Sequence, residues 1–245
     1  MWRTNLLSSF LQPMMYLAGL GIGVGALVDR NVGADSAGTS VVGDSYVAFV
    51  APGLLVTTAM MLSAMESMWP VLAGLKWQRR YHGIAATPLD ATDIVLGHAL
   101  WIVVRCLVAC GAVAGALAVF PDTRSWGLPL AVAAAILTGL AFAMPIAAFA
   151  MGTDADRPFP AIHRFVIIPL FLFGGAFYPL SELPRWVQLL AQVAPLHHGV
   201  ELARAATTAS DLTPRAVVWH VGYLLAFFVV GVAAALPRLR SRLYP

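Results

Sequence analysis

The stretch LPLAVAAAILTGLAFAMPIAAFAM, residues 128–151, contains no charged side chain. A helix needs about 20 mostly apolar residues to cross the hydrocarbon core of a bilayer, and this stretch exceeds that length. No water in lipid can satisfy unpaired backbone groups, so such a segment must form its hydrogen bonds within a helix. Residues 128–151 therefore predict a transmembrane helix.

The composition of the whole chain agrees with a membrane environment. Of its 245 residues 60% are hydrophobic and 11% are charged, with a mean hydropathy of +0.79, whereas a soluble domain has about 25% charged residues. The apolar runs are continuous rather than alternating, which argues against a transmembrane barrel. We predict an all-α integral membrane protein, one domain over residues 1–245 with six transmembrane helices. The predicted spans are 10–28, 48–73, 94–119, 128–151, 163–179 and 217–236.

The basic residues set an orientation for these spans. With a cytoplasmic N-terminus, nine Lys and Arg residues fall in inner segments and five in outer segments, and Arg105 lies within a span. Cytoplasmic loops carry the excess of Lys and Arg in membrane proteins. The sequence therefore predicts that both termini lie in the cytoplasm (N-in, C-in).

Small residues in two spans are interpreted as packing features. The first apolar stretch has no A-x-A cleavage pattern, so it is interpreted as a span rather than a signal peptide. Its residues 19–25, GLGIGVG, hold two overlapping G-x-x-x-G pairs. Such pairs let two helix backbones approach closely, either within one subunit or between two. Cys106 and Cys110 share one helix face and are interpreted as small apolar residues rather than as a disulfide or metal ligands.

The loop over residues 76–93 is the richest inner segment. Residues 76–86 are compatible with a short amphipathic helix, which Pro88 would end because the residue before a proline avoids the helical region. Asp90 or Thr92 would then cap the next helix. Without a partner protein, the same basic residues would serve only as a positive-inside anchor.

Two charged residues, Glu66 and Arg105, lie inside predicted spans. Each costs at least about 2.5 kcal/mol at a helix centre, so each needs a partner or a function. At 1.5 Å per residue, both would lie about 14–17 Å from the inner loop if their helices are antiparallel neighbours. We predict an ion pair; a water-filled cavity or a substrate contact is the alternative for either residue.

The segment between the last two spans, residues 180–207, carries several features. It follows the break GGAFYP at 174–179 and contains the amphipathic stretch 185–193. Pro195 interrupts the chain, and a second short helix is expected over 197–207. A plain extracellular loop is the alternative, but it would not explain the amphipathic spacing. His197 and His198 are adjacent and point to different helix faces, which argues against a metal site.

These patterns resemble the ABC-2 class of ATP-driven exporter permeases. The similarity rests on K-W-Q-x-x-Y from Lys76, A-T-P-L from Ala86 and D-I-V-L-G from Asp93. It also rests on G-G-x-F-Y-P and H-G-x-E-L-x-R after the fifth span. The inner-loop patterns are similar to the subgroup with the nodulation-factor (lipo-oligosaccharide) export permeases and their drug-efflux relatives. Family members usually begin with a longer amphipathic helix, so here either that element is short or the protein starts upstream of Met1.

The resemblance implies two functional segments. The inner loop would be a coupling helix that docks into a groove of an ATPase, with Tyr81, His82 and Ile84 as its apolar and aromatic knob. The outer segment would be a re-entrant helical hairpin that caps the transport path. The implied coupling residues are Lys76, Trp77, Arg79, Arg80, Tyr81, His82, Gly83, Ile84, Thr87 and Pro88. The implied outer-gate residues are Gly174, Gly175, Phe177, Tyr178, Pro179, His198, Glu201 and Arg204.

The sequence contains no G-x-x-x-x-G-K-[ST] phosphate loop. A permease of this class would therefore be no enzyme itself and would bind no cofactor or metal; a separate ABC ATPase would use ATP and Mg. The resemblance also implies a homodimer or a heterodimer with a second permease, contact with membrane lipid and none with nucleic acid, and the bacterial inner (plasma) membrane.

Two other function classes are the alternatives. An ion-gradient-driven secondary transporter would have inverted repeats and broken polar helices near the midplane, and an intramembrane enzyme would need a catalytic constellation. The sequence displays neither. The expected function is export of an amphipathic molecule from the cytoplasm or inner leaflet, such as a lipo-oligosaccharide, a lipid-linked glycan or a drug.

Overall fold

The computed structural model describes residues 46–119, 123–180, 183–208 and 212–244, and every regular element in these ranges is a helix. Four of the helices have the length and composition to cross a membrane. The all-helical membrane class is thus confirmed, while the predicted span 10–28 with its glycine pairs lies outside the described residues. The four helices cover Ala48–Trp77, Ala91–Leu117, Leu128–Gly152 and Pro214–Leu243.

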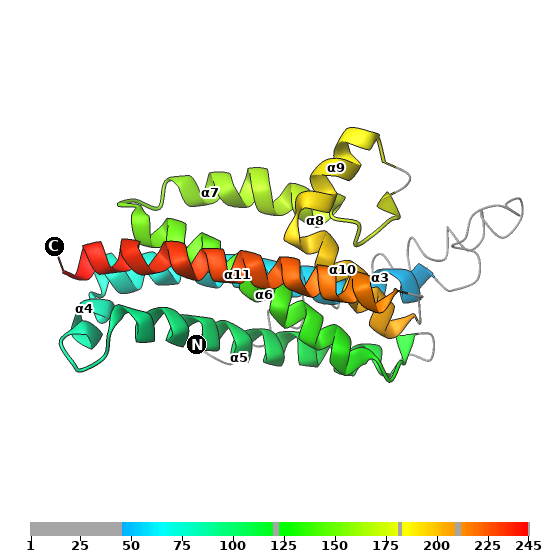
Figure 1. The fold of residues 1–245 in the computed structure, drawn as a ribbon, viewed down its shortest axis with the longest axis horizontal. Coiled ribbons are helices and arrows are strands. Elements are labelled where there is room, and N and C mark those ends of the chain that lie inside the picture. Colours follow the sequence, from blue (N-terminus) through cyan, green and yellow to red (C-terminus); the bar gives the residue numbers. More distant parts are fainter. Residues whose placement is uncertain (1–45, 120–122, 181–182, 209–211, 245) are drawn as a thin grey trace, which may run out of the picture.

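Helix α6 (Leu128–Gly152) lies at the centre of the bundle and contacts α3 (Tyr46–Leu72), α5 (Ala91–Leu117) and α11 (Pro214–Leu243) (Figure 1). Its sequence explains this position, because most of its side chains are small. The four alanines at 131, 135, 143 and 147 are at most 1% exposed. Small side chains allow close backbone approach, which is how helices associate in lipid.

Two glycines, one on α6 and one on α11, lie at close helix–helix contacts. A Cβ atom added to Gly139 would lie 2.6 Å from Ser63 Oγ of α3 and 3.0 Å from Cys106 Sγ of α5. A Cβ added to Gly231 of α11 would lie 2.6 Å from the Cβ of Met144. These positions have no room for a side chain, so α3, α5 and α11 are packed on α6 through small residues.

The ends of the bundle carry the short helices. Figure 1 shows α4 (Arg80–Ala85), the connection from α6 to α7 (Pro158–Ile162) and the C-terminal end of α11 together at one end, which we call the α4 end. Helix α10 (Pro195–Thr207) packs against α3 and α6 toward the other end, which we call the α10 end. Helix α9 (Arg185–Val193) precedes α10 in the chain and contacts it.

The fifth apolar segment differs from the predicted span 163–179. Its helix begins at Pro158, passes through a π-helical stretch, η4 (His163–Ile167), and ends with α8 (Ile168–Phe173). Proline is well accommodated in a first helical turn, which explains the earlier start. The π-helical stretch precedes Pro169, which has no N–H to donate to the preceding turn. The helix ends before Gly174 rather than at 179, and the result is a shorter apolar helix than the four candidate spans.

Helix α11 extends beyond the predicted span 217–236 at both ends. Helix α11 begins at Pro214, in the first-turn position that suits proline, and continues through Pro237 to Leu243. The additional C-terminal turns carry Arg238, Arg240 and Arg242 to the α4 end. These arginines favour the helix because cations stabilise the negative end of the helix dipole.

Candidate functional site

The inner loop is folded as two short pieces rather than as the single helix predicted over 76–86. Helix α3 continues into a π-helical turn, η2 (Ala73–Trp77), and the chain then bends at Arg79. Arg79 has φ 49° and ψ 25°, a left-handed conformation that an α-helix cannot contain. Helix α4 therefore starts anew at Arg80 and spans only six residues.

The second half of the loop follows the expected stop and start signals. Thr87 Oγ1 donates a hydrogen bond to the carbonyl of Ile84 at 2.6 Å, and Pro88 comes next. Asp90, rather than Thr92, is the N-cap of α5. Its backbone N–H donates to Asp93 Oδ2 at 2.8 Å as part of a capping box. The loop is thus fixed at its junction with α5.

Tyr81 points into the protein and not away from it. The side chain is 6% exposed and belongs to the main hydrophobic core. Burial raises the pKa of the Tyr81 hydroxyl, although the neighbouring Arg80 partly opposes this. Ile84 is half-buried while His82 is exposed, so Tyr81, His82 and Ile84 do not form the outward knob that was expected. The exposed members of the implied coupling set are Lys76, Trp77, Arg79, Arg80, His82, Gly83, Thr87 and Pro88.

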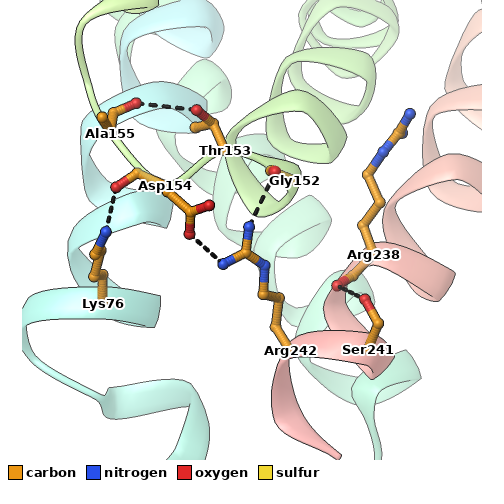
Figure 2. A network of polar contacts seen from close by, with 8 residues as sticks. All are labelled: Lys76, Gly152, Thr153, Asp154, Ala155, Arg238, Ser241 and Arg242. Atoms are coloured by element: carbon orange, nitrogen blue, oxygen red, sulfur yellow. Dashed lines mark hydrogen bonds and ion pairs between the residues drawn. The ribbon is translucent and has the colours of Figure 1, made fainter. Parts of the chain in front are cut away.

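A polar cluster around Asp154 joins three segments at the α4 end (Figure 2). Arg242 of α11 pairs with the Asp154 carboxylate at 2.5 Å and donates to the carbonyl of Gly152 at 3.1 Å. Lys76 donates from Nζ to the backbone carbonyl of Asp154. The hydrogen bond from Arg242 holds the pKa of the Asp154 carboxyl below its usual value. The start of the inner loop, the α6–α7 connection and the end of α11 are therefore linked.

Asp154 was not identified from the sequence. It lies 78 residues from Lys76 and 88 from Arg242, so no local spacing relates them. The predicted topology placed Lys76, Asp154 and Arg242 on the inner side of the membrane. This was the only indication in the sequence analysis that they could meet. A longer contact at the same end joins Arg240 Nη2 to Thr92 Oγ1 at 3.5 Å.

The structure brings Glu66 and Arg105 together. Arg105 donates to Glu66 Oε1 from Nη2 at 2.8 Å and from Nε at 3.1 Å, across the contact between α3 and α5. The side chains of Glu66 and Arg105 are 19% and 17% exposed, respectively. Trp101 donates from Nε1 to Glu66 Oε2 at 3.2 Å, so both carboxylate oxygens are used.

Further polar contacts accompany this pair along α3 and α5. Ser67 Oγ lies 3.1 Å from His98 Nε2, and Ser63 Oγ lies 3.3 Å from Cys106 Sγ. The sequence patterns did not reveal His98 or Trp101 as polar partners in this region. Helical spacing was the signal, since His98, Trp101 and Arg105 occur at i, i+3 and i+7 on one face.

Arg204 stabilises the non-helical segment between α8 and α9. Its Nη2 donates to the carbonyls of Gly175 at 2.6 Å and Ala176 at 3.3 Å. The guanidinium also lies 3.9 Å from the ring centroid of Phe49, whereas Glu201 is only a distant partner at 3.8 Å. Gly175 has φ +81°, which favours glycine at this position.

The other implied gate residues surround this break. Gly174 is buried, and a Cβ added there would lie 2.3 Å from Leu196 Cδ2. Phe177 is also buried and meets Phe171 edge to face at 4.9 Å between ring centroids. Tyr178 and Pro179 are half-buried.

His198 connects α10 to α11 and to the end of α9. The ring is 5% exposed and stacks on Tyr223 at 3.9 Å between centroids. A carbonyl only accepts, so Nε2 donates to Gln192 O at 3.0 Å. The Nδ1 of the neutral ring then accepts from His220 Nδ1 at 2.7 Å. His220 and Tyr223 were missed from the sequence because they lie on a different helix.

Helices α9 and α10 differ in burial. The apolar face of α9 is exposed, with Trp186, Leu189, Leu190 and Val193 each 65–67% exposed. Helix α10 is embedded in the bundle, and a Cβ added to Gly199 would lie 2.0 Å from Thr138 Oγ1. Among the described residues, no three His, Cys, Asp or Glu side chains are arranged to hold a metal ion.

Comparison with known proteins supports the family suggested by the sequence. The model of the ABC-2 type transporter family matches residues 1–207. Nodulation protein J of Rhizobium meliloti (strain 1021) is 32% identical over 100% of this chain and 90% of the relative. Nodulation protein J of Rhizobium leguminosarum bv. trifolii is 31% identical over 99% of this chain and 89% of the relative. The inner membrane transport permease YadH of Escherichia coli (strain K12) is 25% identical over 76% of this chain and 72% of the relative.

The family match covers most of the chain, and the two nodulation protein J relatives align along nearly its whole length. The protein therefore belongs to the ABC-2 type transporter family, as the membrane-embedded permease subunit of a bacterial ABC exporter that works with a partner ABC ATPase.

Proposed function

We propose that the partner ATPase drives this permease through the loop at 76–93 and that the bundle then releases an amphipathic molecule outward. The observation that carries this proposal is the attachment of the loop to the bundle. Tyr81 is buried in the core, Lys76 binds the α6–α7 connection, and Thr92 contacts α11. A push on the loop would therefore act on several helices at once, as energy coupling requires.

Three exposed residues of the loop are the proposed contact with the ATPase. Trp77 is 60% exposed, and His82 and Gly83 are exposed on α4. In this proposal Tyr81 transmits the movement into the core and does not enter the ATPase groove.

The proposed orientation is N-in and C-in with six spans, which places the α4 end in the cytoplasm. The basic residues support it, because Lys76, Arg79, Arg80 and the arginines at the end of α11 gather at that end. Helices α9 and α10 would then form a re-entrant hairpin at the outer leaflet. Arg204 and His198 hold this hairpin to the bundle and would have to release it for an outward opening.

The proposed substrate class follows from the subgroup resemblance. Two of the relatives are named nodulation protein J, and the resemblance suggests a lipo-oligosaccharide, a lipid-linked glycan or an amphipathic drug. The permease would act as a homodimer or with a second permease, together with its ATPase subunits.

A bulky residue at position 83 tests the coupling surface. No described atom lies within 4 Å of a Cβ added to Gly83, so Gly83→Trp should project from α4 without disturbing the permease. The variant should insert normally but lose the ATPase on purification, together with substrate-stimulated ATP hydrolysis. Added bulk in a close-packed contact typically costs about 1–3 kcal/mol, roughly five- to 150-fold in affinity. Gly222→Trp on α11 is the matched control, because that position is equally open. Normal ATPase retention by Gly83→Trp would remove α4 from the coupling surface.

Cysteine labelling tests the orientation. The native Cys106 and Cys110 are buried and should not react. Gln78→Cys, at an exposed position of the loop, should react with an impermeant thiol reagent only from the cytoplasmic side, and Gln192→Cys only from outside. Labelling of position 78 from outside would reverse the proposed topology and exclude the loop as the ATPase contact.

A further inference from the structure

A cavity of about 430 Å³ lies between α3, α4 and α5 at the α4 end. Glu66 and Pro70 of α3 line one side of the cavity, and Arg80 and Tyr81 of α4 line another. The α5 wall runs from Leu89, just before the helix, to Trp101. This volume is within the range of small-molecule sites, which are mostly apolar and aromatic with a few placed polar groups.

The charges in this cavity are of both signs. Glu66 is neutralised by Arg105 at 2.8 Å. Arg80 and Asp93 also line the cavity, both are exposed, and neither forms an ion pair with a described residue. Asp93 accepts the backbone N–H of Asp90 through Oδ2. One cation and one anion are therefore available to a ligand.

The cavity extends from the edge of the candidate span of α5 into its membrane-spanning part. Ala91 begins the candidate span of α5, and Trp101 follows ten residues later, about 15 Å along the helix. The Trp101 side chain is 52% exposed. Asp93 is in the first turn of α5, so the charged mouth of the cavity lies near the lipid head groups and Trp101 lies deeper in the membrane.

We propose that this cavity binds the head group of one zwitterionic phospholipid from the leaflet around the α4 end. Arg80 binds the phosphate, as guanidinium groups commonly do. The ammonium lies on the acidic side of the cavity, beside the Asp93 carboxylate, because opposite charges attract. The acyl chains extend out of the cavity along its apolar lining residues and into the membrane.

Gly97 provides a way to fill the cavity without disturbing the helix. It lines the cavity, and no described atom lies within 4 Å of a Cβ added there. Gly111 on the same helix is also open but does not line the cavity. Glycine is a poor helix former, so Gly97→Leu and its matched control Gly111→Leu should both fold. Leu89→Trp fills the same cavity from the loop side. It is the second test variant, to be used if Gly97→Leu folds poorly.

Native mass spectrometry of the full chain, titrated with phosphatidylethanolamine and phosphatidylglycerol of identical acyl chains, tests the proposal. The wild type should bind one phosphatidylethanolamine at least about tenfold more tightly than one phosphatidylglycerol. Gly97→Leu or Leu89→Trp should abolish this preferred site, Arg80→Gln should weaken it, and Gly111→Leu should retain it. Equal binding of the two lipids, tighter phosphatidylglycerol binding, or an unchanged site in Gly97→Leu would overturn the proposal. The measurement needs no ATPase, so its failure would leave the proposed coupling role intact.

Discussion

Replacing Glu66 with glutamine tests whether the ion pair between α3 and α5 stabilises the bundle. The carboxylate accepts two hydrogen bonds from Arg105, at 2.8 and 3.1 Å, and one from Trp101 at 3.2 Å. The amide of the Glu66→Gln variant would keep one carbonyl oxygen but no charge. Arg105 would then remain as a cation inside a helix bundle without a compensating anion.

The structure sets the expected magnitude. Removing one partner of a buried ion pair costs about 3–5 kcal/mol, because the remaining charge is left uncompensated. Both side chains retain nearly a fifth of their exposure, at 17% and 19%, so water relieves part of this cost. We therefore expect about 3 kcal/mol, the lower end of that range. At roughly 2–4 °C per kcal/mol, the Tm should fall by about 6–12 °C.

Thermal unfolding of the purified permease in detergent provides the measurement. Trp101→Phe is the matched control, because it removes one neutral donor and should cost only about 1 kcal/mol. The charge swap Glu66→Arg with Arg105→Glu should recover part of the loss, although Trp101 then loses its present acceptor. A Tm of Glu66→Gln equal to that of the wild type would refute the stabilising role. A swap no better than the worse single variant would show that the two residues do not pair.

Three further predictions concern the two ends of the bundle. Arg242→Gln should lower the Tm by an amount that is constant from pH 7 to 5. This amount should vanish in acid, because the folded-state pKa of Asp154 lies below its ordinary value of 3.8 and stability is lost only as the pH falls through it. Gly199→Ala should lower stability by about 1–3 kcal/mol in thermal unfolding, because its Cβ would lie 2.0 Å from Thr138 Oγ1. His198→Ala should cost about 1–3 kcal/mol in the same assay, because it removes a buried hydrogen-bonding ring.

The two predictions for α10 each have a control variant. Gly222→Ala adds a Cβ in open space within α11 and should not lower the Tm, because alanine is the better helix former. His197→Ala removes a half-buried neighbour and should have a smaller effect than His198→Ala. Equal Tm values for the two histidine variants would show that His198 does not hold α10. A Tm difference for Arg242→Gln that disappears already between pH 7 and 5 would contradict the depressed pKa of Asp154.

Local signals predicted part of the structure well. The amphipathic stretch at 185–193 coincides with α9, and Asp90 is the N-cap of α5. Both features depend on residues within one or two turns, where periodicity and capping act directly. The contact of Glu66 with Arg105 was predicted from the distance of each residue from the inner loop. Residues at equal distances from a short loop lie at the same level when their two helices are antiparallel neighbours.

The sequence pattern failed where packing or a single backbone angle decides the outcome. Hydropathy could not locate the end of the fifth helix, because residues up to 179 are still largely apolar. The chain breaks at Gly174 and Gly175, where Leu196 and Leu180 approach closely. The helix expected over 76–86 is interrupted by Arg79, a residue type with no intrinsic preference for a left-handed conformation.

The polar contacts that were missed share a common cause. Asp154 meets Arg242, and His198 meets His220, because two helices end or pass at the same level of the bundle. Sequence separation carries no information about such encounters, since the lengths of α6 and α11 and the embedding of α10 determine them. The Arg242 contact in particular requires the additional C-terminal turns by which α11 exceeds its predicted length. The helical turns after 236 therefore place Arg242 beside Asp154, and hydropathy does not predict them because they are rich in arginine.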